Sequence, residues 1–330
     1  MKKRSSGLMD YAGTFGALLI LCIIMTIASD KFLRVNNLMN ILKQTSFNAL
    51  VATGMLLALI TAGIDLSVGA VATFAGCVAG FLLSRGVNNA LILILVMLLT
   101  GTAIGTINGL LLTRLHLPHP FVSTLGMKNV LWGASLIVTN SQMIAFSNRG
   151  VDGVLTLGSA TIAGFPVSFV VVIIIYIIMH ILLTRTSLGR SIYCVGGNPE
   201  ATRLSGINSA NVLTFCFAVS GFMAALAGLV TIGRSGICNG ANAIQPYDTD
   251  AIAACIIGGA SFRGGKGTMI GTMLGALIIS VLRNGFTLLS VDSSWQNLVL
   301  GLVIIGAVLL DVIRGRMAAN ALRKAAAAIK

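Results

Sequence analysis

Lys266 is the residue of this chain that invites a nucleotide-binding interpretation. Residues 258–267 read Gly-Gly-Ala-Ser-Phe-Arg-Gly-Gly-Lys-Gly, and a lysine among glycines is typical of loops that hold phosphates. Such a loop also needs a glycine at position 260 and a serine or threonine at position 267, where this chain has Ala260 and Gly267. The segment therefore predicts a tightly turning connector, and we expect this chain to bind no ATP itself.

The spacing of the other reactive side chains disfavours metal and catalytic chemistry. The six cysteines lack the Cys-x-x-Cys spacing of zinc sites, and the three histidines are scattered. Most cysteines fall in apolar runs, where they behave as small apolar residues. The chain has no Ser-His-acid order and no pair of catalytic carboxylates. We therefore expect no catalytic residue, no metal site and no bound cofactor.

Asp65 stands between two long apolar runs with no connecting loop. The surrounding sequence supplies two hydroxyls and two glycines, in the order Thr61, Gly63, Asp65, Ser67 and Gly69. One interpretation makes Asp65 the N-cap of the following helix, where its carboxylate accepts free N–H groups. The other makes the segment a hinge or part of a hydrated translocation path. The two interpretations are compatible.

A second polar break lies near residue 250 and has the same two interpretations. Asp250 precedes a charge-free run at residues 251–262, which is too short to cross a membrane as a straight helix. We expect a half-length or re-entrant helix with Asp250 as its cap, surrounded by protein or by an aqueous cavity. Gly258, Gly259 and Ser261 follow as further candidates for the path or hinge.

Composition determines the class of protein that must position these residues. The chain is 56% hydrophobic and only 9% charged, whereas soluble domains carry roughly 25% charged residues. We predict an all-α integral membrane protein. The formal net charge of +13 is explained by membrane orientation and contact with anionic lipid, and no basic patch is interleaved with aromatics as nucleic-acid binding would require.

Charge-free stretches mark the expected spans, because an unpaired charge at mid-bilayer costs several kcal/mol. Ten segments result: residues 11–29, 44–64, 66–84, 86–113, 129–148, 153–184, 204–233, 251–262, 267–282 and 293–310. With the amino terminus in the cytoplasm, most basic residues, Lys128 among them, fall in cytoplasmic connectors. The positive-inside rule then predicts that both termini are cytoplasmic.

Two similar segments of the sequence predict an internal duplication of the chain. Residues 101–109 and 267–275 are identical at six of nine positions and lie 166 residues apart in a chain of 330. Five spans per half would place the second half in inverted topology. The glycines of these segments also form packing ladders that let helix backbones approach closely. These helix-packing candidates are Gly101, Gly105, Gly109, Gly267, Gly271 and Gly275.

The longest polar stretch, residues 185–211, is the candidate contact with a partner outside the bilayer. Within it, Asn198-Pro199-Glu200 is a helix-start pattern, with proline near the first helical position and an acid in the first turn. A short rigid helix is expected here. We divide the single transmembrane domain, residues 1–330, into repeat halves at 11–148 and 153–310, with a cytoplasmic tail at 311–330.

Four ordered motifs carry a resemblance to a known family. They are ITAGIDLSVGA at 60–70, LPHPFVSTLG at 117–126, GRSIYCVGGNPEATRLSGI at 189–207 and YDTDAIAACIIGGASFRGGKGT at 247–268. With these motifs the chain resembles permease subunits of bacterial ABC importers for ribose, allose, galactose and xylose, within the wider family of branched-chain amino acid permeases. The similarity runs from about residue 36 to residue 311.

The resemblance implies an inner-membrane permease that works as two copies with a cytoplasmic ABC ATPase and a periplasmic sugar-binding protein. ATP and Mg²⁺ would be bound by the ATPase. The coupling residues that dock on it would be Gly196, Gly197, Asn198, Pro199, Glu200, Arg203, Leu204 and Ser205. Other solutes of the family, such as an autoinducer or a branched-chain amino acid, stay open as alternatives, as does an ion-coupled secondary sugar transporter.

Overall fold

The computed structural model describes residues 11–115 and 117–327, and it confirms an all-α fold. The helices are α1 (Ala12–Ala28), α2 (Val35–Ile60), α3 (Val68–Ser84), α4 (Ala90–Thr113), α5 (Pro120–Val138), α6 (Asp152–Ser159), α7 (Val167–Arg185), α8 (Ser187–Gly197), α9 (Pro199–Leu204), α10 (Ser209–Ser235), α11 (Tyr247–Ile257), α12 (Met269–Leu288) and α13 (Ser293–Ala327). Four basic residues that the predicted topology places in the cytoplasm lie outside the described residues: Lys2, Lys3, Arg4 and Lys330.

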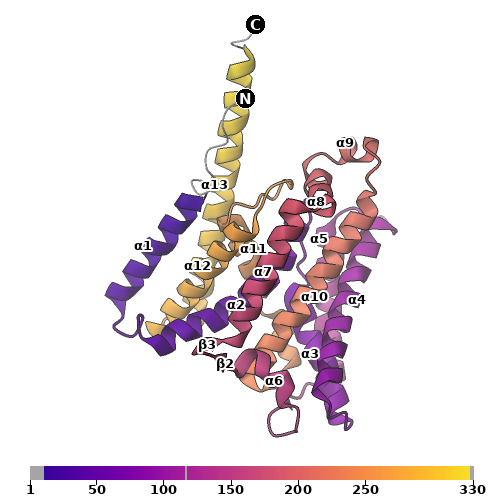
Figure 1. Cartoon of the computed structure of the whole chain (residues 1–330), viewed down its shortest axis with the longest axis vertical. Coiled ribbons are helices and arrows are strands. Elements are labelled where there is room, and N and C mark those ends of the chain that lie inside the picture. The colour runs from indigo at the N-terminus through magenta and orange to yellow at the C-terminus, as the bar shows by residue number, and fades with distance from the viewer. Residues whose placement is uncertain (1–10, 116, 328–330) are drawn as a thin grey trace.

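Short elements complete the fold. Strand β1 (Ile144–Ala145) pairs antiparallel with β4 (Ile237–Cys238), and β2 (Thr161–Ile162) pairs antiparallel with β3 (Phe165–Pro166). A 3-10 helix, η2 (Gly240–Ile244), leads into α11. We call the end of the bundle that carries α8 and α9 the α9 end, and the end that carries α6 the α6 end (Figure 1).

Long helices pass between these two ends in alternating directions. At the α9 end, α1 begins beside the end of α11, because the Thr14 hydroxyl donates to the Ile257 carbonyl at 3.1 Å. The chain leaves the bundle at the same end, since α13 extends past it on that side (Figure 1). The descending α10 packs along the ascending α4, and α12 packs against α11.

Five helices in the described part of the chain are long and apolar enough to cross a membrane: α4, α5, α7, α10 and α12. The apolar helices α1, α3 and the Ser293–Leu309 part of α13 are each shorter than that. At 11 residues, α11 is about 16 Å long. The chain is therefore a multi-pass membrane protein. The short helix α11 lies where the sequence predicted a half-length helix.

Two predicted boundaries are wrong for the same reason, which is that paired charges are tolerated inside helices. Lys128 was placed in a connector before a span at 129–148, yet it lies within α5. The span at 267–282 was ended before Arg283, which lies within α12. Both cations are ion-paired with α11. The sequence prediction ended each span at the first charged residue. In these two helices that residue lies inside the helix, because a distant partner compensates its charge.

Other corrections concern chain breaks. The predicted span at 153–184 is divided into α6 and α7 by the β2–β3 hairpin. The predicted span at 44–64 overlaps α2, which begins earlier, at Val35, and ends at Ile60. The segment predicted as a tail, 311–330, is helical as far as Ala327, and its cytoplasmic location stays a prediction.

The first glycine ladder packs α4 tightly against α10. A Cβ added at Gly109 would lie 2.7 Å from Thr214 Cα, and one at Gly105 would lie 3.0 Å from the Gly221 nitrogen. Gly101 and Gly221 face each other across the same seam. Because any side chain here would collide with backbone, the seam lies within this chain and fixes the spacing of the two helices.

The second ladder is shorter than predicted and faces a different neighbour. Gly271 and Gly275 of α12 pack on Gly258 and Ala254 of α11. Gly267 does not belong to this ladder, because it precedes α12 with φ of 149° and forms part of the glycine turn. The predicted assignment of Gly267 to a helix face is therefore wrong.

Candidate functional site

The polar stretch at residues 185–211 forms two helices at the α9 end (Figure 1). Asn198 caps α9, since its side-chain oxygen accepts from the Ala201 amide at 3.0 Å. Pro199 opens that helix, and Glu200 in its first turn pairs with Arg203 at 2.8 Å. The Leu204 side chain is 76% exposed, which makes α9 a small protruding surface with an apolar residue at its tip. Ser205 ends the helix and is also exposed.

The base of this projection packs on the glycine turn at residues 258–267. A Cβ at Gly196 would overlap the Ile60 carbonyl and lie 2.9 Å from the Gly265 nitrogen. The Gly265 amide donates to the same Ile60 carbonyl at 2.8 Å. By contrast, a Cβ at Gly197 would meet only Gly265 Cα, at 3.9 Å. Three segments therefore meet by backbone contact: the end of α8, the end of α2 and the glycine turn.

Tyr193 of α8 adds a side-chain link to this junction. Its hydroxyl donates to the Gly267 carbonyl at 2.7 Å. Burial raises the pKa of Tyr193 above its usual value, so the hydroxyl stays protonated and keeps donating. The backbone of the turn is held in the left-handed region at Gly264 and Gly265, with φ of 77° and 69°, which other residues adopt at a cost.

Asp65 lies inside the bundle, where three serine groups bind it. Its Oδ1 accepts from the Ser67 amide at 3.0 Å and the Ser67 hydroxyl at 2.6 Å, and its Oδ2 accepts from the Ser220 hydroxyl at 2.7 Å. Ser220 is close to the middle of α10. The residue at the N-cap position of α3 is Ser67, two residues after Asp65, so the cap interpretation of Asp65 is wrong as stated.

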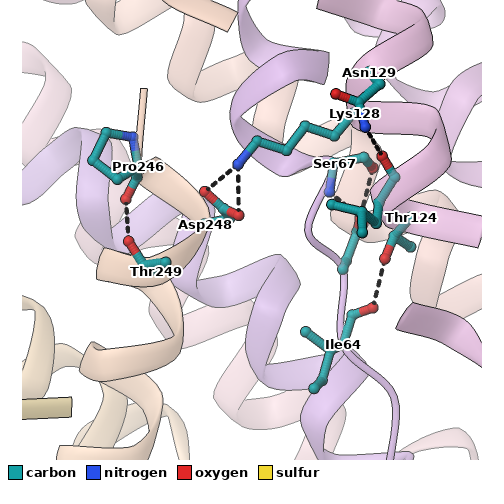
Figure 2. A network of polar contacts seen from close by, with 10 residues as sticks. Ile64, Ser67, Thr124, Lys128, Asn129, Pro246, Asp248 and Thr249 are labelled. Carbon is teal, nitrogen blue, oxygen red and sulfur yellow. Dashed lines mark hydrogen bonds and ion pairs between the residues drawn. The ribbon is translucent and has the colours of Figure 1, made fainter. Parts of the chain in front are cut away.

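The Asp65 segment is joined to α4 and α5 by further polar contacts. The Asn108 side chain donates to the Ser67 hydroxyl at 2.9 Å, and the Thr124 hydroxyl donates to the Ile64 carbonyl at 3.1 Å. Figure 2 shows the Thr124 contact beside the ion pair of Lys128. Thr61 and Gly63 are buried between this segment and the end of α2. The break between α2 and α3 is thus tied to α10, α4 and α5.

Two ion pairs hold α11 between its neighbours. The Lys128 Nζ of α5 lies 2.9 Å from Asp248 Oδ2, as Figure 2 shows. The Arg283 guanidinium of α12 contacts both carboxylate oxygens of Asp250, at 2.6 and 2.7 Å. Helix α11 has Pro246 at its N-cap position and no side-chain cap. The prediction of Asp250 as a cap is therefore wrong, because its carboxylate is used by Arg283.

A polar cavity of about 480 Å³ begins where α11 starts. Its walls come from α2, α10, α11, α12 and the first turns of α13. The start of α11 also touches α3, since a Cβ at Gly69 would lie 3.1 Å from Tyr247 Cβ. The amino-terminal ends of α3 and α11 therefore meet inside the bundle, and the cavity leads from that point toward the α6 end.

The predicted path residues divide between these places. Asp250 lines the cavity. Gly69 packs against Tyr247, which is part of the cavity wall. The buried break contains Thr61, Gly63, Asp65 and Ser67. Gly258 packs on α12, Gly259 is exposed with φ of 93°, and Ser261 is buried in the glycine turn. The last three belong to the glycine turn and do not line the cavity.

Sequence reasoning missed the partners of these residues. Lys128, Arg283 and Ser220 each bind an aspartate that lies 33 to 155 positions away. The signal available in the sequence was chemical: five of the six residues are charged within otherwise apolar helices, where a lone charge is costly. The sequence therefore allowed the prediction that these charges are paired, but it did not indicate which residues pair with one another.

Comparison with known families decides the class of the chain. The model of the family described as branched-chain amino acid transport system, permease component, matches residues 37–308. This chain belongs to that family. The match covers the buried break, the cavity, α8 and α9, and both glycine ladders. Members of this family are transport components and not enzymes, and this chain is a permease subunit.

Named relatives extend over nearly the whole permease. The ribose import permease protein of Haemophilus influenzae is 40% identical over 300 residues, which is 90% of this chain and 92% of the relative. The ribose import permease protein of Bacillus subtilis is 37% identical over 92% of this chain and 94% of its own length. The D-allose transport system permease protein of Escherichia coli is 38% identical over 92% and 91%. No solved structure matches this chain.

Proposed function

We propose that this chain is the membrane-spanning subunit of a bacterial ABC importer that carries a monosaccharide of the ribose or allose type across the inner membrane. The observation that carries the proposal is the similarity to ribose and allose permeases at 37–40% identity over nine-tenths of the chain. A neutral polyhydroxylated solute also suits the interior, because the three buried aspartates described above are already bound by protein groups.

The proposed architecture has ten membrane segments in two inverted halves. The first half is α1 to α5, and the second is α7 and α10 to α13. Matching contacts support this pairing: α4 packs on α10 as α12 packs on α2, and α3 packs on α4 as α11 packs on α12. The glycine ladders do not follow the same pairing, since one faces α10 and the other faces α11.

Two copies of the permease would form the transport path together with a cytoplasmic ABC ATPase and a periplasmic sugar-binding protein. In this arrangement the α9 end and both termini are cytoplasmic, and the α6 end is periplasmic. ATP and Mg²⁺ bind to the ATPase and not to this chain. Exposed residues of α9, above all Glu200, Arg203 and Leu204, dock on the ATPase.

The mechanism follows from the junction beneath α9. When ATP binding moves α9, the backbone contacts of Gly196 transmit the displacement to Ile60 and the glycine turn. Ile60 ends α2 directly before the Asp65 break, and the turn follows α11 directly. A movement of the ATPase would therefore reach α3 through the Asp65 break and α11 through its carboxyl end. These are the two helices whose amino ends meet inside the bundle, and their joint displacement is what alternating access requires.

The test is purification followed by reconstitution. The permease is expressed with its tag and isolated in mild detergent, and the co-purifying ATPase is assayed in lipid with a panel of sugar-loaded binding proteins. Stimulation of ATP hydrolysis by a ribose- or allose-loaded protein is the expected result. Recovery of the chain without an ATPase, together with sugar uptake driven by an ion gradient, would contradict the proposal.

A further inference from the structure

The polar cavity at the start of α11 contains hydrogen-bonding groups that no other described part of the chain satisfies. The Gln44 Oε1 atom is buried and has no partner. No hydrogen bond within the described residues is made by the Arg234 guanidinium or the Tyr247 hydroxyl, both of which line the same cavity. Buried polar atoms without partners are costly. Gln44 is the one residue with such a buried atom that lines this cavity, whereas Arg234 is exposed and Tyr247 is half-buried there. The polar groups of these three side chains are therefore available to a molecule that enters the cavity.

The charges of the cavity divide it into a neutral floor and a basic mouth. Asp250 at the floor is 4% exposed and uses both carboxylate oxygens on Arg283. This pair therefore leaves no free carboxylate for a cation. Arg234 lies in the last turn of α10 and is the exposed basic residue of the lining. A ligand that reaches the floor meets polar atoms without net charge.

The apolar part of the lining has a defined orientation. The rings of Phe47 and Tyr247 pack edge to face, with centroids 4.6 Å apart. Phe47 is 8% exposed and lies on the buried side of the cavity. An aromatic pair beside amide and guanidinium groups is an amphipathic lining, which suits a ligand that has both C–H faces and hydroxyls.

From these groups we infer that the permease itself has a weak binding subsite for a neutral polyhydroxylated molecule in this cavity, between Gln44, Phe47, Arg234 and Tyr247. A hydroxyl can donate to Gln44 Oε1 and accept from Arg234, which a deprotonated phosphate or carboxylate cannot do at both places. The volume of about 480 Å³ lies within the range of small-ligand pockets, roughly 300–1,000 Å³.

The inference rests on the proposed function. It adds a second site of sugar recognition, in the permease, to the one in the binding protein. A sugar released by a binding protein at the α6 end would enter at Arg234 and reach Gln44 at the level where α3 and α11 begin. The subsite must be weak, because a tightly held sugar would not leave toward the other side. The permease would then contribute to the choice of solute and would not be a passive path.

The experiment uses the permease with its ATPase in lipid nanodiscs, without binding protein, and D-ribose as the probe. Saturation-transfer NMR is expected to detect ribose at millimolar concentration, with a signal at least fivefold weaker in Gln44→Leu. The matched control is Gln142→Leu, at an exposed glutamine after α5, which should keep the wild-type signal. Equal signals in both variants, or no signal in wild type, would overturn the inference.

A second arm tests the chemical class and separates this inference from the proposed function. Ribose 5-phosphate should not displace ribose, and displacement at lower concentration than ribose itself would show an anion site and overturn the neutral class. Gln44→Leu should lower sugar uptake several-fold, whereas the control Gln142→Leu should keep both uptake and ATPase stimulation by the loaded binding protein. Loss of stimulation in the wild-type complex would instead count against the proposed function.

Discussion

The carbonyl oxygen of Ile60 accepts the Gly265 amide at 2.8 Å, at the point where Gly196 packs against both residues. Ile60 ends α2, and Gly265 belongs to the turn between α11 and α12. Segments more than 200 positions apart in the chain therefore share one backbone contact beneath α9. This contact connects the segment beneath the exposed helix with two helix ends of the bundle.

Replacement of Gly196 at this contact should reduce stability and uptake much more than replacement of the adjacent Gly197. Gly196→Ala places a Cβ against backbone atoms of Ile60 and Gly265, and overpacking of this kind costs about 1–3 kcal/mol. We expect a lower thermal midpoint and sugar uptake reduced at least tenfold. Gly197→Ala is the control, because its Cβ would meet only one atom, at 3.9 Å. Similar uptake in the two variants would show that the contact does not transmit movement.

The ion pair of Lys128 and Asp248 should stabilise α11 against α5. The Asp248 side chain is 5% exposed, and removal of one partner of a buried pair costs about 3–5 kcal/mol. Lys128→Met should therefore lower stability, and Lys128→Met with Asp248→Asn should recover part of the loss. Thermal unfolding in lipid nanodiscs measures both. An additive loss in the double variant would mean that the two charges do not interact.

Close packing of α4 on α10 gives a third expectation. Gly105→Ala would bring a Cβ to 3.0 Å from the Gly221 nitrogen, whereas Gly126→Ala on α5 has no atom within 4 Å. The first variant should be destabilised by about 1–3 kcal/mol and the second by much less. Yield and unfolding temperature of the two purified variants are the measurements. Equal behaviour would contradict the observed seam.

Cys194 reports the orientation of the α9 end. It is exposed on α8, whereas Cys22 is half-buried and the other four cysteines are buried. A membrane-impermeant maleimide should modify Cys194 in inside-out vesicles and leave it unmodified in intact spheroplasts. Cys194→Ser identifies the labelled site. Labelling from the outside only would reverse the proposed orientation.

Local patterns were predictable from the sequence, and long-range pairings were not. Asn198 caps α9 because a cap depends on the next three residues, and the short α11 was visible as a short apolar run. Asp65 was recognised as unusual, but its partner Ser220 lies 155 positions away. The predicted start of α5 was wrong because the charge of Lys128 is compensated by Asp248. No residue near Lys128 in the sequence indicates that partner.

The most direct test of the central claim is sugar uptake into proteoliposomes that contain the permease, its ATPase and the loaded binding protein. Uptake should require ATP inside the vesicle, and it should be lost with ATPase co-purification in Leu204→Asp, whose side chain is 76% exposed on α9. Ile244→Asp, 52% exposed on η2, should keep the ATPase bound. Uptake that persists without ATP, or in Leu204→Asp, would contradict an ATP-driven importer coupled through α9.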